Sequence, residues 1–205
     1  YSSNDDQIYI GYSIVGRQKT INKQNYSSEG FVYMTGHIGT AIIFAAIEQK
    51  ILSGAYSKQV IKEMTTSNHK IYEVLYKNNV NMITDISGFG LAIHLYNLIL
   101  RFPHLKGIEL SINQIPLYPG VELALSKNVK SSLNDANKNY IISKLNNSNK
   151  NHKLSNILYD PQTAGGFVFI LNDNKEKILN DFSKNNIDLS LIGKIKNTNK
   201  KITVI

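Results

Sequence analysis

The stretch Thr84-Asp85-Ile86-Ser87-Gly88-Phe89-Gly90-Leu91 decides how this 205-residue chain is interpreted. It ends a short apolar segment, 80–86, that predicts a β-strand, and it opens a strongly apolar segment, 90–102, that predicts a helix stopped by the proline that follows. An aspartate between a strand end and a glycine turn can hold Mg²⁺ beside polyphosphate, because Mg²⁺ takes one or two carboxylates plus water and phosphate oxygens. Asp85 is therefore a candidate metal ligand. The same pattern also allows an alternative, in which Asp85 and Ser87 only end the strand and cap the helix.

A second segment with paired glycines reads Tyr159-Asp160-Pro161-Gln162-Thr163-Ala164-Gly165-Gly166 and precedes a predicted strand at 167–171. Pro161 fixes one backbone dihedral angle, and the glycine pair permits backbone angles that other residues avoid. By itself this pattern indicates a constrained loop.

The rest of the chain alternates between strand-like and helix-like patterns. Further strands are predicted at 7–17, 31–34, 107–112, 189–195 and 202–205, and further helices at 40–52, 57–78 with a break near 67–68, 121–126 and 175–185. The segment 127–156 is rich in Asn, Lys and Ser, and we expect it at the surface with one helix around 140–145. Mixed strands and helices without an internal repeat predict a single α+β domain, with a mixed β-sheet packed against several α-helices.

The formal net charge of +8 is compatible with binding to nucleic acid, but only Arg17 and Arg101 are arginines. Arginine is the residue that reads guanine edges and grips phosphates through two parallel hydrogen bonds. The other basic residues are lysines dispersed among asparagines. We therefore expect no nucleic-acid partner.

The composition also restricts the class of protein. The chain has no cysteine, which excludes disulfides, thiolate metal sites and a cysteine nucleophile within it. The longest apolar stretch, 41–47, is far shorter than the roughly 20 residues that cross a bilayer, so we expect no membrane association and a cytoplasmic location. The chain begins at Tyr1 without an initiator Met or a secretory signal, so we expect a piece of a longer protein.

The two glycine-containing segments together resemble two motifs of the selenophosphate synthetases (selenide, water dikinases). Residues 84–91 are similar to the family's Thr-Asp-Val-Thr-Gly-Phe-Gly-Leu, and residues 160–166 are similar to its Asp-Pro-Gln-Thr-Ser-Gly-Gly. Residues 115–122 resemble the segment between these motifs, and Met64 with Asn68 resembles the Met/Asn pattern on the helix before the aspartate. The resemblance extends from Gln7 to Ile205.

This resemblance implies a C-terminal domain with the aminoimidazole-ribonucleotide-synthetase-like fold at 31–205. Residues 1–30 would be the last strand and connector of an N-terminal ATP-binding domain. Members of the family convert selenide, ATP and water into selenophosphate, AMP and orthophosphate, and the residue that matches Asp85 binds Mg²⁺ in them. The catalytic and ATP-binding residues, and most of the homodimer contacts, belong to the N-terminal domain. We therefore expect Asp85 to be the one site residue of this chain, and the chain alone to be inactive.

Two departures from the family pattern leave alternatives open. The family's Thr-Lys-Pro-Leu-Gly is replaced by Thr35-Gly36-His37-Ile38-Gly39, which loses a lysine, and the glycine of Gly-Leu-Leu-Gly-His is replaced by Ile93. The parent protein could be a divergent selenophosphate synthetase or another ATP-using member of the superfamily, such as a thiamine-monophosphate kinase or a hydrogenase-maturation protein. It could also be a non-catalytic interaction module that kept the fold.

The histidines give weaker indications. His94 lies on an apolar helix, where a hydrogen-bonded core histidine is the more common role than a ligand. His37 lies at a predicted helix start, where it could approach an anion, but the sequence names no partner for it. His69, His104 and His152 show no metal-ligand spacing.

Overall fold

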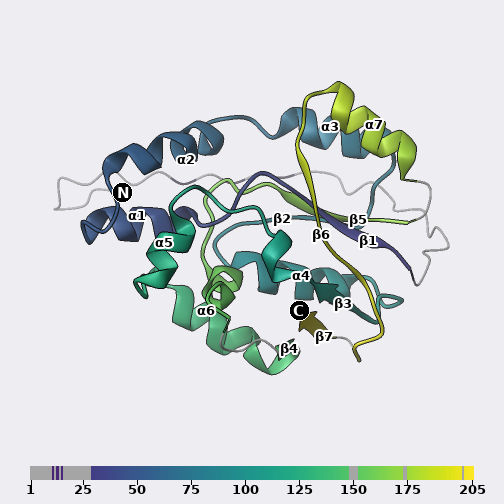
Figure 1. The fold of residues 1–205 in the computed structure, drawn as a ribbon. Coiled ribbons are helices and arrows are strands. Elements are labelled where there is room, and N and C mark those ends of the chain that lie inside the picture. The colour runs from purple at the N-terminus through teal and green to yellow at the C-terminus, as the bar shows by residue number, and fades with distance from the viewer. Residues whose placement is uncertain are drawn as a thin grey trace.

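The computed structural model describes residues 11, 13, 15, 29–147, 152–172, 175–199 and 201–205. The strand predicted at 7–17 lies outside the continuously described ranges. Within those ranges the chain forms one mixed sheet with helices on both faces (Figure 1), so the predicted α+β class is confirmed. No helix in the described ranges combines the length and the apolar character that a membrane crossing requires.

The sheet joins strands from both ends of the described chain. Its members are β1 (Phe31–Thr35), β2 (Ile83–Asp85), β3 (Gly107–Leu110), β4 (Leu145–Asn147), β5 (Phe167–Leu171), β6 (Leu189–Ile195) and β7 (Lys201–Val204). Their spatial order is β2-β5-β1-β6-β3-β7-β4, and the pairs are antiparallel except for β3–β7 and β4–β7. Among the described strands, β2 lies at an edge of the sheet and pairs with β5, and its last residue, Asp85, lies opposite Phe167, the first residue of β5.

The helices follow the apolar patterns closely. They are α1 (Thr40–Glu48), α2 (Ser57–Met64), α3 (His69–Lys77), α4 (Gly90–Arg101), α5 (Val121–Ser126), α6 (Asn134–Ile141) and α7 (Glu176–Lys184). The predicted break near 67–68 is confirmed by the separation of α2 from α3. Helix α1 ends earlier than predicted, because Lys50 takes a left-handed backbone angle, φ 59°, that a helix cannot contain.

The two faces of the sheet carry separate apolar cores, because side chains alternate along each strand. Val32 of β1 and Val168 of β5 point into the larger core, which includes the buried face of α4. Tyr33 and Phe169 point to the opposite face, where Phe169 stacks on Phe182 of α7 with ring centroids 5.4 Å apart. Figure 1 shows α3 and α7 together above the sheet and α4 below it.

Several side chains in the described part of the segment 127–156 are buried, although its composition predicted a surface position. Its helix is α6, at 134–141, and Asn134, Asn137 and Ile141 are buried. The Asn137 side chain donates to the carbonyl oxygens of Gly88 and Tyr159, both at 3.0 Å. The polar composition that predicted a surface segment therefore includes an asparagine, Asn137, that joins two turns distant in the sequence.

Candidate functional site

The two segments that the sequence singled out meet in space. The backbone N–H of Ile86 donates to the carbonyl of Gly166 at 3.0 Å, and the N–H of Gln162 donates to the carbonyl of Ser87 at 3.2 Å. We call residues 85–90 the Asp85 loop and residues 160–166 the second-motif turn. Pairing of β2 with β5 brings them together, because one segment leaves β2 and the other enters β5.

Glycines at this junction allow the backbones to approach. Gly90 has a φ of +75°, and a Cβ there would lie 2.9 Å from the carbonyl carbon of Tyr159. A Cβ at Gly165 would lie 2.4 Å from the carbonyl oxygen of Ile86. Any side chain at either position would force the two segments apart.

The polar residues of the second-motif turn serve helix α1. Gln162 Oε1 accepts from the backbone N–H groups of Gly39 and Thr40, at 3.0 and 3.1 Å. Asp160 Oδ2 accepts from Gln162 Nε2 at 2.9 Å and lies 3.5 Å from the Ile42 nitrogen. Asp160 and Gln162 are buried, so they supply the acceptors that the free N–H groups of a buried helix start require.

Burial has an electrostatic effect on Asp160. It raises the pKa of this carboxyl to about 7, against the lowering effect of the hydrogen bonds from Gln162 and Ile42. The turn that the sequence identified as a constrained loop therefore holds a carboxyl group that titrates near neutral pH.

Asp85 lies at the end of β2 with its carboxylate open to solvent. The side chain is 62% exposed, and its carboxylate lies 4.0 Å from His94 Nδ1. At the start of helix α4, the Gly90 N–H donates to the backbone carbonyl of Ser87 at 2.9 Å. Within the described ranges, no group of three or more His, Asp or Glu side chains could enclose a metal ion. A single exposed carboxylate fits an ion such as Mg²⁺, which completes its shell with water and phosphate oxygens.

His94 is buried, as the sequence indicated, and it braces the Asp85 loop. Its Nε2 accepts from the backbone N–H of Ser87 at 3.1 Å. The proton of the neutral ring therefore lies on Nδ1, which faces Thr84 Oγ1 at 3.3 Å and the Asp85 carboxylate. Burial lowers the pKa of His94, and the Asp85 charge opposes this effect. The ring is thus a neutral support for the loop.

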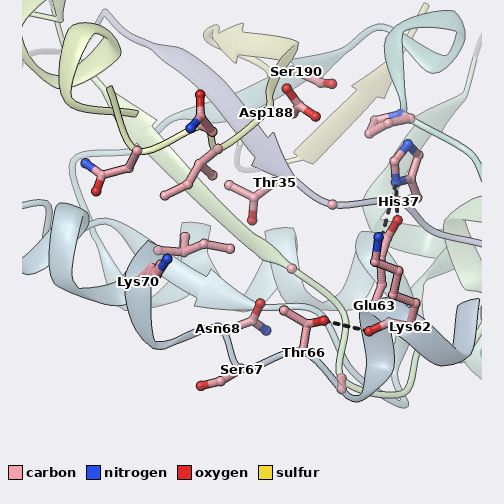
Figure 2. A pocket seen from close by; sticks show the side chains of 18 of the residues that line it. Thr35, His37, Lys62, Glu63, Thr66, Ser67, Asn68, Lys70, Asp188 and Ser190 are labelled. Carbon is pink, nitrogen blue, oxygen red and sulfur yellow. Dashed lines mark hydrogen bonds and ion pairs between the residues drawn. The ribbon is translucent and has the colours of Figure 1, made fainter. Parts of the chain in front are cut away.

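A second feature is an open cleft of about 560 Å³ on the face of the sheet that carries α3, which we call the His37 cleft (Figure 2). It is lined by residues 35–37, 62, 63, 66–68, 70, 71, 116, 118, 164, 166, 185–188 and 190. Ala164 and Gly166 belong to the second-motif turn, so the cleft borders the structure that supports Asp85. Asn68 strengthens this junction, because its Nδ2 donates to the carbonyl of Gly165 at 3.0 Å.

The sequence gave no partner for His37, and the structure supplies one. His37 Nδ1 lies 3.0 Å from Glu63 Oε1, a residue 26 positions later on α2. The hydrogen bond to Glu63 raises the pKa of His37. Burial raises the pKa of Glu63, but hydrogen bonds from His37, Gln59 and Tyr118 outweigh burial and bring it to about 2. Glu63 is therefore a fixed carboxylate. The pair joins the connection between β1 and α1 to helix α2, which no sequence spacing relates.

Comparison with known proteins places these features in a family. The family model described as "AIR synthase related protein, C-terminal domain" matches residues 30–205. Selenide, water dikinase 2 of Peptoclostridium acidaminophilum is 24% identical over 214 residues, which cover 100% of this chain and 60% of that protein. Selenide, water dikinase of Treponema denticola is 27% identical over 171 residues, which cover 80% of this chain and 47% of that protein. The chain thus spans about half the length of the curated relatives it matches.

Solved structures agree on the fold. Thiamine-monophosphate kinase from Stenotrophomonas maltophilia K279a superposes with a TM-score of 0.56 at 14% identity, covering 85% of this chain and 49% of that chain. The hydrogenase maturation protein HypE of E. coli gives a TM-score of 0.56 at 14% identity, covering 88% and 47%. Likeness at this identity shows the fold alone, and it confirms the fold that the resemblance implied. By its fold and by the match over residues 30–205, this chain belongs to the AIR synthase related proteins, as their C-terminal domain.

Proposed function

We propose that this chain is the C-terminal part of a selenophosphate synthetase, which makes selenophosphate, AMP and orthophosphate from selenide, ATP and water. The observation that carries the proposal is the exposed Asp85 carboxylate, held at a strand end on a loop that both motif segments build. The curated relatives described above are named selenide, water dikinase, which supports the same reaction.

In this proposal Asp85 contributes one oxygen ligand to Mg²⁺, which would neutralise charge on the phosphates during transfer. The chain's own residues position that carboxylate. His94 holds Ser87 through Nε2, and the Gly166 carbonyl holds Ile86. The two residues that follow Asp85 are thereby anchored, and Asp85 itself pairs with Phe167 of β5, while its side chain stays in solvent.

The remaining parts of the site are proposed to lie outside this chain. An N-terminal domain would bind most of the ATP, with residues 1–30 as its last strand and connector and residues 31–205 as the C-terminal domain. The parent would form a homodimer through the N-terminal domain and act in the cytoplasm. The chain alone would then neither form AMP from ATP nor make selenophosphate.

The experiment is the substitution Asp85→Asn, made in this chain and in the full-length parent. Asn keeps the size of the side chain and removes the charge that Mg²⁺ requires. We expect thermal unfolding of the chain to be unchanged, and selenophosphate formation by the parent, followed by ³¹P NMR, to be severely reduced. Asp135→Asn is the control, because Asp135 is an exposed carboxylate at the surface, where it pairs with Lys130. A destabilised chain with normal parent activity would reverse the assignment.

A second candidate function is an interaction module without catalysis. The observation in its favour is the replacement of the family's Lys-Pro by Gly36-His37 in the His37 cleft. The same assay separates the two candidates, because a non-catalytic parent forms no AMP with ATP, Mg²⁺ and selenide, whatever stands at position 85.

A further inference from the structure

We propose that the His37 cleft binds a phosphate-bearing small molecule, with His37, Lys62 and Lys70 as the groups that hold the phosphate. The proposal that phosphate binds here is argued from the residues that line the cleft. Its connection to the reaction of the parent protein deepens the proposed function and rests on it.

His37 is oriented so that one ring nitrogen remains available. Nδ1 is engaged by Glu63 at 3.0 Å, whereas Nε2 has no hydrogen-bond partner among the described residues. Glu63 in turn receives a hydrogen bond from Gln59 Nε2 at 2.9 Å. The pair thus fixes the ring, and its carboxylate favours the protonated imidazole, in which Nε2 is a charged donor.

Two lysines add positive charge to the same cleft. Lys62 and Lys70 line it from α2 and α3, and neither forms a salt bridge with a described residue. Other lysines of the chain do form such bridges, as Lys130 does with Asp135. Cations left without a carboxylate partner in a concave site are suited to an anionic ligand.

The carboxylates of the cleft do not cancel this charge. Glu63 is engaged by His37, which leaves Asp188 as the carboxylate that faces the cations from the other wall. Figure 2 shows Asp188 and Ser190 on one side of the cleft and Asn68 and Lys70 on the other, with Thr35 between them. With His37 protonated, three cationic groups stand against two carboxylates, Glu63 and Asp188, so the cleft keeps a net positive charge that favours a phosphate over a metal ion.

The volume of the cleft and the uncharged hydrogen-bond donors on its wall indicate a small-molecule ligand. A volume of about 560 Å³ lies in the range of ligand pockets, roughly 300–1,000 Å³. Ser67 and Asn68 lie along one wall. The Ser67 hydroxyl accepts from the His69 N–H and keeps its own proton, and Asn68 Nδ2 has a second proton besides the one it donates to Gly165, so both can donate to phosphate oxygens.

The position of the cleft connects it to Asp85. Gly166 lines the cleft, and its carbonyl accepts the hydrogen bond from Ile86 in the Asp85 loop. A phosphate in the cleft would therefore contact the turn that supports the candidate Mg²⁺ ligand. If the parent transfers phosphoryl groups, this is a place where a substrate or product phosphate can be held.

The test is a titration of the ¹⁵N-labelled chain with inorganic phosphate and, separately, with AMP, at an ionic strength held constant with chloride. We expect saturable shifts in the NMR signals of His37, Asn68 and Gly166 and not at the far edge of the sheet. Equal affinities for inorganic phosphate and AMP would show that the phosphate group alone is recognised. A higher affinity for AMP would show that the rest of the nucleotide also contacts the cleft. Both results support the proposal.

Variants make the test specific to the named groups. Lys62→Met and Lys70→Met should each raise the dissociation constant about tenfold, since each removes one charge-assisted hydrogen bond. Lys58→Met, at an exposed position of α2 that does not line the cleft, is the matched control and should change nothing. Shifts that rise linearly without saturation, or equal affinities in all three variants, would overturn the proposal.

One further variant separates this inference from the proposed function. Asp85→Asn should leave phosphate binding unchanged, because Asp85 does not line the cleft. Lysine-dependent binding by the chain together with a parent that makes no selenophosphate would reject the proposed function and keep the site. An active parent whose C-terminal chain shows no saturable binding would reject the site and keep the function.

Discussion

Gln162 Oε1 lies 2.9 Å from Thr40 Oγ1, although 122 residues separate the two along the chain. The same oxygen accepts hydrogen bonds from the backbone N–H groups of Gly39 and Thr40, so one side chain provides the acceptor for the N–H groups at the buried start of α1. We expect Gln162→Ala to lower the free energy of unfolding by roughly 1–3 kcal/mol, because it leaves buried donors without an acceptor. Urea unfolding measures this difference. Thr163→Ala, at the neighbouring exposed position, should have almost no effect, and equal losses in both variants would contradict the capping role.

The buried Asp160 should make stability depend on pH. Burial raises its pKa from 3.8 to about 7, so between these values the folded state keeps a proton that the unfolded state has released. This contribution to stability is fully present below about pH 4 and is lost as the pH rises through about 7. Asp160→Asn imitates the protonated carboxyl, so its stability relative to the original chain should increase from pH 4 to pH 8. Urea unfolding across this range tests the trend, and a constant difference would refute it.

Glu63 should control the protonation of His37. We expect Glu63→Gln to lower the pKa of His37, because it removes the carboxylate that favours the imidazolium while the charge of Asp188 remains nearby. The ring signals of His37, followed by NMR as the pH changes, measure this shift. Glu73→Gln is the matched control, since Glu73 pairs with the exposed His69 on α3. If both variants left the His37 titration unchanged, the 3.0 Å contact would have no electrostatic effect.

Two glycines of one loop should respond differently to an added methyl group. Gly90→Ala should destabilise the chain by at least about 1–3 kcal/mol, because φ is +75° there and the new Cβ would lie 2.9 Å from the Tyr159 carbonyl carbon. Gly88→Ala should be close to neutral, because a Cβ at Gly88 meets nothing within 4 Å. Thermal unfolding of both variants gives the comparison. Similar melting temperatures would mean that the two motif segments do not need this close approach.

Local apolar patterns predicted most elements of the fold. The apolar run at 90–102 predicted α4, and the polar break near 67–68 predicted the division between α2 and α3. Strand β4, at 145–147, was missed because its three residues carry little local signal. It forms only by pairing in parallel with β7, which lies more than fifty residues later. Long-range pairing of this kind leaves no trace in a short window of sequence.

The candidate site divides in a similar way. The sequence identified Asp85 and both motif segments from their residues, and its interpretation of His94 as a buried histidine agrees with the structure. It missed the capping of α1 by Gln162, the titrating carboxyl of Asp160 and the His37–Glu63 pair. Each of these depends on residues from different elements. One signal in the sequence was Gln162, a polar side chain in a turn whose shape requires only proline and glycine. A polar side chain kept in such a turn indicates a hydrogen-bond partner.

By itself the sequence determined the fold class, the family to which the chain is similar and the residue types at the two turns. These depend on local periodicity and on motif order, which a linear chain records directly. The tertiary structure alone decided that the two turns touch, that Gln162 accepts hydrogen bonds from a helix start 122 residues away and that His37 meets Glu63 in a cleft that Lys62 and Lys70 also line. Such contacts arise when the strands pair and the buried polar groups must find partners, and burial then sets which of those groups keeps its charge.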